Sequence, residues 1–219
     1  MVSKNHPRIL IVEGAEDKRV IPELIEKNGI IWEDKNLPKN VPVFIKEYGG
    51  YKNITRDRVY FALQQSGLKS LGIIVDADSE LSDRWQSVRD NLCEPLMPDF
   101  PKELPETGLI HTAPNGVKFG VWIMPDNQNR GMLETFLTYL IPNTGEPIWD
   151  YAKEATQEAT NKGAPFIEKH TDKANIHTWL AWQDEPGNQL HDAVKFKIFE
   201  PTHLKAQVFV NWFKTLYDL

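Results

Sequence analysis

Two short apolar runs, each ending in an acidic residue, constrain the fold of this chain more than any other feature. Residues 8–13 read Arg-Ile-Leu-Ile-Val-Glu, and residues 71–76 read Leu-Gly-Ile-Ile-Val-Asp. Each run has the length of a strand, and neither alternates between apolar and polar residues. Strands that are apolar on both faces are expected where helices cover both sides of a parallel sheet. The two runs therefore predict an α/β fold with acidic residues at its strand ends.

Helical patterns and turn signals surround these strands in the first two thirds of the chain. We predict helices over residues 16–28, 53–66, 81–92 and 132–141, a strand over residues 42–48, and a hairpin of residues 109–112 and 119–124 around an Asn-Gly turn. The alternation of strands and helices favours right-handed βαβ crossovers. Residues 1–145 are thus predicted to form a Rossmann-like domain, with a mainly parallel sheet and helices on both faces.

The remaining residues, 146–219, are predicted to be a mainly helical extension packed on the same core. The clearest pattern is an apolar stripe at helical spacing near the end of the chain. The stripe consists of Leu204, Val208, Phe209, Trp212, Phe213 and Leu216. We expect this last helix to pack against the sheet.

Composition and charge exclude several classes of protein. No apolar run approaches the roughly 20 residues needed to cross a bilayer, and the first residues are polar, which predicts a cytoplasmic protein without membrane contact. The single cysteine, Cys93, permits no disulfide within the chain and no cysteine-rich zinc site. A net charge of −6 argues against a chain that coats nucleic acid non-specifically. An acidic chain is still compatible with a metal site, because bound cations neutralise carboxylates.

Three acidic residues are expected at one edge of the sheet. Glu13 ends the first strand, Asp76 ends the third, and Asp78 follows two residues later. Ligands of open α/β sheets bind beyond the carboxyl ends of the strands, and carboxylates are ligands that suit Mg²⁺ or Mn²⁺. Crowded carboxylates without a cation raise one another's pKa values, so we predict a shared divalent ion. Strand-end solvation or helix capping is the alternative, and for Asp17 a favourable helix-dipole position explains its charge equally well.

These segments resemble the Toprim superfamily over about residues 8–140. Residues 9–17, Ile-Leu-Ile-Val-Glu-Gly-Ala-Glu-Asp, are similar to the first Toprim motif, and residues 73–78, Ile-Ile-Val-Asp-Ala-Asp, are similar to its Asp-x-Asp motif. Toprim domains occur in topoisomerases, bacterial primases, recombination proteins and OLD-type nucleases. The resemblance implies that Glu13, Asp76 and Asp78 support Mg²⁺ at a phosphodiester.

Further segments, residues 122–127, 131–136 and 178–187, are similar to an uncharacterised family of stand-alone Toprim-like proteins. In OLD-type members a further acidic residue follows the next strand and can support a second metal. By this resemblance Asp126 or Glu134 takes that role here. Capping of the following helix by Asp126, or solvation of Glu134, accounts for the two residues equally well.

The leading hypothesis is a Mg²⁺- or Mn²⁺-dependent nuclease that hydrolyses phosphodiesters in DNA or RNA. Lys173, in a basic region with Lys169, Lys195 and Lys197, is the candidate for stabilising charge in the transition state. Two alternatives remain: a regulatory or adaptor module that requires a partner such as an ATPase, and a receiver-like domain phosphorylated on Asp76. His170 and His177 are seven residues apart, but without further metal-binding motifs we interpret them as exposed or hydrogen-bonded. The oligomeric state is left open.

Overall fold

The computed structural model describes residues 6–32 and 41–219. Within these residues five strands form one sheet in the order β2-β1-β3-β5-β4. The strands are β1 (Arg8–Val12), β2 (Phe44–Glu47), β3 (Ser70–Asp76), β4 (Leu109–Thr112) and β5 (Lys118–Met124). The pairs β1–β2, β1–β3 and β3–β5 are parallel, and β4 is antiparallel to β5. The predicted mainly parallel sheet is confirmed, and so is the hairpin.

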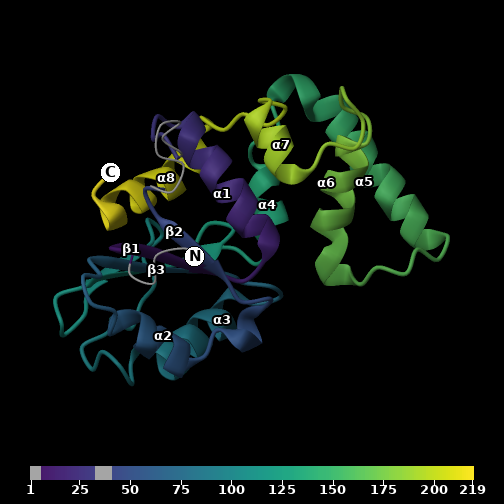
Figure 1. Cartoon of the computed structure of the whole chain (residues 1–219). Coiled ribbons are helices and arrows are strands. Elements are labelled where there is room, and N and C mark those ends of the chain that lie inside the picture. Colours follow the sequence, from purple (N-terminus) through teal and green to yellow (C-terminus); the bar gives the residue numbers. More distant parts are fainter. Residues whose placement is uncertain (1–5, 33–40) are drawn as a thin grey trace.

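Helices lie on both faces of the sheet (Figure 1), where α1 and α8 are on one side and α2 and α3 on the other. The helices are α1 (Ala15–Lys27), α2 (Arg56–Leu63), α3 (Leu81–Val88), α4 (Leu133–Thr138), α5 (Glu146–Asn161), α6 (Thr171–Leu180), α7 (Leu190–Lys195) and α8 (Leu204–Tyr217). The α/β fold is therefore Rossmann-like with additional C-terminal helices. None of the helices in the described part of the chain has both the length and the apolar character that a membrane span requires.

The alternation of side chains along the strands creates two cores. Leu10, Val12, Ile74 and Trp122 point to the face covered by α1 and α8. Their strand neighbours, such as Ile11 and Ile73, point to the face covered by α2. Because both faces are buried, the strands carry no polar stripe, which explains their continuous apolar sequence.

A pair of glycines lets α8 approach the sheet closely. Gly72 in β3 and Gly120 in β5 are direct neighbours in the register of the two strands. A methyl group at Gly120 would lie 2.6 Å from Leu216 Cδ2, and one at Gly72 would clash with the Tyr217 hydroxyl. Tyr217 Oη instead donates a hydrogen bond to the carbonyl oxygen of Ile9 at 2.9 Å. The glycines are therefore required for helix packing rather than for an unusual backbone conformation.

Three details differ from the sequence-based expectations. Leu204 and Val208 are 82% and 39% exposed, because the buried face of α8 is rotated towards Ala206 and Val210. Helix α2 begins later than predicted, because the Thr55 side chain caps it by accepting a hydrogen bond from Arg58 N. The receiver-like alternative does not fit the topology, because receiver sheets have the order 2-1-3-4-5, whereas β4 here is an antiparallel edge strand.

Candidate functional site

The acidic residues lie at the carboxyl ends of the neighbouring strands β1 and β3, where the order of the strands across the sheet reverses. From β1 the chain passes through α1 to β2 on one side of the sheet, and then returns through α2 to β3 on the other side. Such a switch point opens a crevice at the carboxyl ends of the strands. Glu13 directly follows β1, Asp76 is the last residue of β3, and Asp78 follows it. The structure thus places all three predicted acidic residues at the same edge.

A cleft of about 760 Å³ opens over this edge. A second cleft of about 540 Å³ adjoins it and shares Asp78 and Lys169 in its lining. The charged residues that line the first cleft are Glu13, Glu16, Asp17, Lys52, Asp76, Asp78, Arg84, Glu134, Lys169 and Lys173. Six carboxylates therefore face four cationic side chains in one connected depression.

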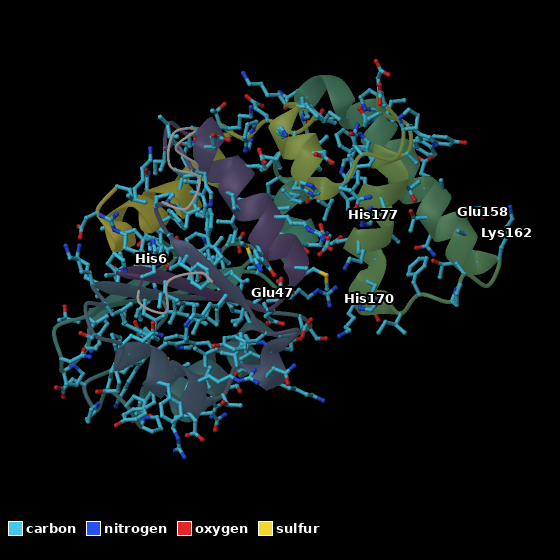
Figure 2. The ribbon with its side chains drawn as sticks, viewed as in Figure 1. His6, Glu47, Glu158, Lys162, His170 and His177 are labelled. Atoms are coloured by element: carbon cyan, nitrogen blue, oxygen red, sulfur yellow. The ribbon has the colours of Figure 1, made fainter. Side chains whose placement is uncertain are left out.

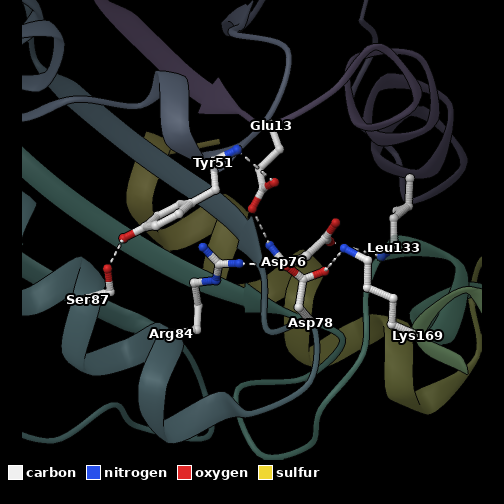
Figure 3. Close-up of polar contacts among 8 residues, drawn as sticks. All are labelled: Glu13, Tyr51, Asp76, Asp78, Arg84, Ser87, Leu133 and Lys169. Carbon is white, nitrogen blue, oxygen red and sulfur yellow. Dashed lines mark hydrogen bonds and ion pairs between the residues drawn. The ribbon is translucent and has the colours of Figure 1, made fainter. Parts of the chain in front are cut away.

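Glu13 is fixed by backbone donors from two neighbouring segments. Its Oε1 accepts a hydrogen bond from Asp76 N at 2.9 Å, and its Oε2 accepts one from Tyr51 N at 3.0 Å. Figure 3 shows these contacts, with the carboxylate between the ends of β1 and β3. Burial raises the pKa of Glu13, although the backbone donors and Arg84 oppose that shift. The carboxylate is consequently held in a single orientation above the strand ends.

Asp76 and Asp17 are the most strongly perturbed groups of the cleft. Burial, together with the charges of Asp17, Glu13 and Glu134, raises the pKa of Asp76 well above its ordinary value. Burial likewise raises the pKa of Asp17 to about 7, although its Oδ2 accepts a hydrogen bond from Gly14 N at 3.0 Å. Asp76 Oδ1 accepts a hydrogen bond from Leu133 N at 3.1 Å. Mutual repulsion between buried carboxylates is what a bound cation would relieve.

Asp78 occupies a left-handed backbone conformation with φ 57°, which aspartate tolerates better than most residues. Its backbone N and O each exchange a 2.9 Å hydrogen bond with Gly131, which ties the loop after β3 to the loop after β5. Its side chain accepts a hydrogen bond from Arg84 at 2.8 Å, and Lys169 Nζ lies 3.9 Å from its other oxygen. Asp78 is therefore paired with the chain's own cations in this structure.

Of the two candidates for a second metal, only Glu134 lines the cleft. It lies in the first turn of α4, is 3% exposed, and forms a 2.9 Å ion pair with Lys173. Asp126 lies outside, where it accepts hydrogen bonds from Gln128 N, Asn129 N and the Tyr139 hydroxyl. Asp126 therefore stabilises the turn at residues 126–129 and does not cap α4, whose N-cap residue is Met132, so the predicted capping of that helix by Asp126 is wrong.

The sequence belongs to a family without an assigned function. Residues 7–218 match the family described as "Protein of unknown function (DUF3226)". The chain belongs to this family. No curated protein matches the DUF3226 chain.

One of two similar solved structures supports the fold of the DUF3226 chain. One similar structure is the C-terminal region of the Xanthomonas campestris pv. campestris OLD protein phased with mercury, with a TM-score of 0.51, 14% identity, and coverage of 99% of this chain and 98% of that chain. Another is the same region phased with iodine, with a TM-score of 0.39, 15% identity, and coverage of 95% and 86%. At this identity the first structure supports an OLD-like fold, in agreement with the OLD-type resemblance of the sequence.

Two histidines and four lysines were singled out from the sequence of the DUF3226 chain, and only some of them line the cleft. His170 lines the cleft from the turn before α6, whereas His177 is exposed further along that helix (Figure 2). Lys169 and Lys173 line the cleft, but Lys195 and Lys197 do not. Of the basic region, only Lys169, just before α6, and Lys173, in its first turns, face the acidic residues.

The carboxylate oxygens of the cleft are the kind of ligand that a hard divalent cation prefers. In this structure they are not arranged to hold one. Among residues 6–32 and 41–219, no group of three or more His, Cys, Asp or Glu side chains is arranged to hold a metal ion. The reason lies in the contacts above: Glu13 is bound to backbone N–H groups, Asp78 to Arg84, and Glu134 to Lys173. A metal would fit this DUF3226 site after displacement of at least one internal cation.

The raised pKa of Asp17 predicts how the stability of the metal-free protein depends on pH. The ordinary pKa of 3.8 rises to about 7 in the folded state, so the folded state binds a proton that the unfolded state has already released. Stability should therefore fall as pH rises from about 4 to about 7, by an amount on the order of a few kcal/mol. Asp17→Asn keeps the acceptor for Gly14 N and removes the charge, so its profile should be flatter.

The measurement is thermal melting in EDTA across that pH range. Asp57, which lies exposed in the first turn of α2, provides the control substitution Asp57→Asn, which should keep the wild-type slope. Equal slopes for wild type and Asp17→Asn would show that Asp17 does not hold its proton as we expect.

Proposed function

We propose that this chain is a Toprim-type phosphodiesterase that cleaves nucleic acid with Mg²⁺ or Mn²⁺. The observation that carries the proposal is the convergence of Glu13, Asp76 and Asp78 at the switch point of the sheet, next to the buried Asp17 and Glu134. Burial, together with repulsion within this group, raises the pKa values of Asp76 and Asp17. Strongly perturbed carboxylates in a cleft are typical of sites that bind a metal or move protons.

The residues of the cleft have distinct roles in this proposal. Asp76 and Asp78 would hold the ion, and Glu134 is the candidate for a second one. When bound, the metal supplies charge for the phosphate oxygens and lowers the pKa of an attacking water. Glu13, fixed by two backbone donors, would either bind the same ion or accept the proton of that water. Lys173 would stabilise the negative charge that develops on the phosphate.

The form of the depression favours a polymer as the substrate. The first cleft connects to the second through Asp78 and Lys169, so the acidic residues do not lie at a closed end. Lys52 lies on one side of them, after β2, and Arg130 and Lys169 line the second cleft together with the acidic residues Asp78, Glu80, Glu168 and Asp172. Cationic side chains on both sides can contact successive phosphates of a chain. A nucleic acid strand fits this distribution better than a small phosphate ester does.

One observation favours a different function, a regulatory module that requires a partner such as an ATPase. Asp78 and Glu134 are both paired with cations of the same chain, at 2.8 Å and 2.9 Å. Such pairing neutralises the ligands that a metal needs. If a partner were required to release these pairs, the isolated chain would have little activity.

The deciding assay is incubation of the purified chain with single- and double-stranded DNA and RNA in Mg²⁺, Mn²⁺ or EDTA. We expect cleavage of at least one substrate with a divalent ion and none in EDTA. If no substrate is cut with either metal, the proposed activity is wrong for the chain alone. Addition of a partner that restores cleavage would then support the regulatory alternative.

Lys173→Ala is expected to lower turnover by about tenfold to a hundredfold, because it removes a positive charge next to the reacting phosphate. Lys153 on α5 forms a surface pair with Asp150 and provides the control substitution Lys153→Ala. Steady-state rates of both variants at saturating metal give the comparison. Equal rates would show that Lys173 only neutralises Glu134.

A further inference from the structure

Arg84 is a cationic residue of the cleft that was not singled out from the sequence. It lies in the first half of α3, directly after the loop that carries Asp78. Its Nη2 donates a 2.8 Å hydrogen bond to Asp78 Oδ2, and its side chain is only 12% exposed. Its charge also lowers the pKa of Glu13 against the effect of burial. One guanidinium group therefore acts on two of the three predicted metal ligands.

The aromatic ring of Tyr51 supports this guanidinium. The Arg84 guanidinium carbon lies 3.8 Å from the centre of the ring, within the range of a cation–π contact. The Tyr51 hydroxyl and Ser87 Oγ share a 2.8 Å hydrogen bond, which fixes the ring against α3. Tyr51 N donates at the same time to Glu13. Figure 3 shows this chain of contacts from Ser87 through Tyr51 to Glu13, with Arg84 beside it.

The hydrogen-bonding capacity of Arg84 is incompletely used. A guanidinium has five N–H donors in a planar fork, and Arg84 Nε is buried without a partner. An unpaired buried donor costs free energy, and native structures usually satisfy such groups. Arginine at a site with spare donors is suited to two parallel hydrogen bonds with a phosphate. Because Arg84 lines the cleft while its Nε is buried, a phosphate on the open side would meet the outer N–H groups of the guanidinium.

A divalent ion and Arg84 compete for Asp78. In the present arrangement the guanidinium is bonded to Oδ2 of Asp78, one of the two oxygens that an ion could bind. Once an ion takes Asp78, the guanidinium loses its anion but keeps its support on Tyr51. It then requires another anion within reach.

We propose that Arg84 has two successive partners: Asp78 in the metal-free protein, and a non-bridging phosphate oxygen of the nucleic acid once a divalent ion is bound. This inference rests on the proposed function and adds to it a phosphate-binding residue that couples metal binding to substrate binding. Metal and substrate should consequently bind more tightly together than separately. Phosphate would then bind to a preformed Arg84–Tyr51 surface.

The first test is calorimetric titration of the metal-free protein with Mn²⁺ at a fixed pH of about 8, which lies above the pKa of about 7 for Asp17. Arg84→Gln should bind Mn²⁺ about tenfold more tightly than wild type, because a competing charge is removed. Arg84→Lys should resemble wild type, since the charge is kept. Arg89→Gln is the matched control, because Arg89 pairs with Asp90 outside the cleft and lies just after α3.

The second test is binding of a fluorescein-labelled oligonucleotide in Ca²⁺, measured by anisotropy. Arg84→Gln and Arg84→Lys should both bind about tenfold more weakly than wild type, because an ammonium group cannot replace the planar fork. Unchanged Mn²⁺ affinity or unchanged oligonucleotide affinity in Arg84→Gln would overturn the inference while leaving the metal site intact. If wild type binds no Mn²⁺ at all, the proposed function fails instead, and the two failures are distinguishable.

Discussion

Asp76→Asn is expected to reduce divalent-dependent cleavage by at least about a thousandfold while the protein remains folded. The substitution deletes the charge of a proposed metal ligand at the end of β3, and charge stabilisation by a metal contributes several kcal/mol to such reactions. Asparagine keeps the oxygen that accepts the hydrogen bond from Leu133 N. Because the folded environment raises the pKa of Asp76, the charged form is destabilised at neutral pH. The variant should therefore melt at a higher temperature than wild type in EDTA.

The measurement combines initial cleavage rates in Mn²⁺ with thermal melts in EDTA. Asp150→Asn provides the control, because Asp150 lies on the surface of α5 and pairs with Lys153. Addition of Mn²⁺ should raise the melting temperature of wild type and of the control, but not that of Asp76→Asn. Wild-type cleavage by Asp76→Asn would place the catalytic metal elsewhere.

Gly72→Val is expected to destabilise the fold by about 3 kcal/mol or more, because the side chain would enter the space that Tyr217 and Leu216 occupy. The Tyr217 side chain is fully buried and bonded to Ile9, so it cannot turn aside without loss of that bond. Gly72→Ala should have a smaller cost, of about 1–3 kcal/mol. Denaturant unfolding of each variant gives these free energies.

A double substitution separates steric conflict from loss of backbone freedom. Tyr217→Phe removes the hydroxyl that a methyl group at Gly72 would meet, so Gly72→Ala should cost less in that background than in wild type. Gly145→Ala is the control, because a methyl group there meets only ordinary contacts, and its effect should stay within about 0.5 kcal/mol. If Gly72→Ala costs the same in both backgrounds, contact with Tyr217 is not the reason for the glycine.

The strands and the three acidic residues were predictable because their signals are local. Leu10 and Val12 pack on one face of the sheet and Ile9 and Ile11 on the other, so burial on both sides leaves a continuous apolar run. Parallel pairing of β1 with β3 then brings Glu13 to the same edge as Asp76. Alternation of strands and helices is sufficient to predict that arrangement.

The contacts that complete the cleft were not predictable, since they join segments distant in sequence. Arg84 contacts Tyr51 because α3 packs next to the turn after β2. No motif or spacing in the sequence predicts this contact. The sequence predicts Asp17 only as an acidic residue in the first turn of a helix. Its raised pKa results from burial, which the sequence does not show. Leu204 and Val208 fit a helical stripe, yet the sheet determines which face of α8 is covered. The Gly72–Gly120 pair has meaning only in the register of two strands.

The hydrogen bond between Tyr217 and Ile9 spans 208 residues of sequence and has a consequence for the order of folding. The sheet face that carries Leu10, Ile74 and Trp122 receives its cover from α8, which follows the strands and α1 to α7 in sequence. During translation this apolar face stays uncovered until α8 has left the ribosome. Contacts of such high sequence separation slow folding and prolong the lifetime of aggregation-prone intermediates. The packing of α8 on the sheet, rather than formation of the acidic cleft, should thus limit the rate at which the native protein forms.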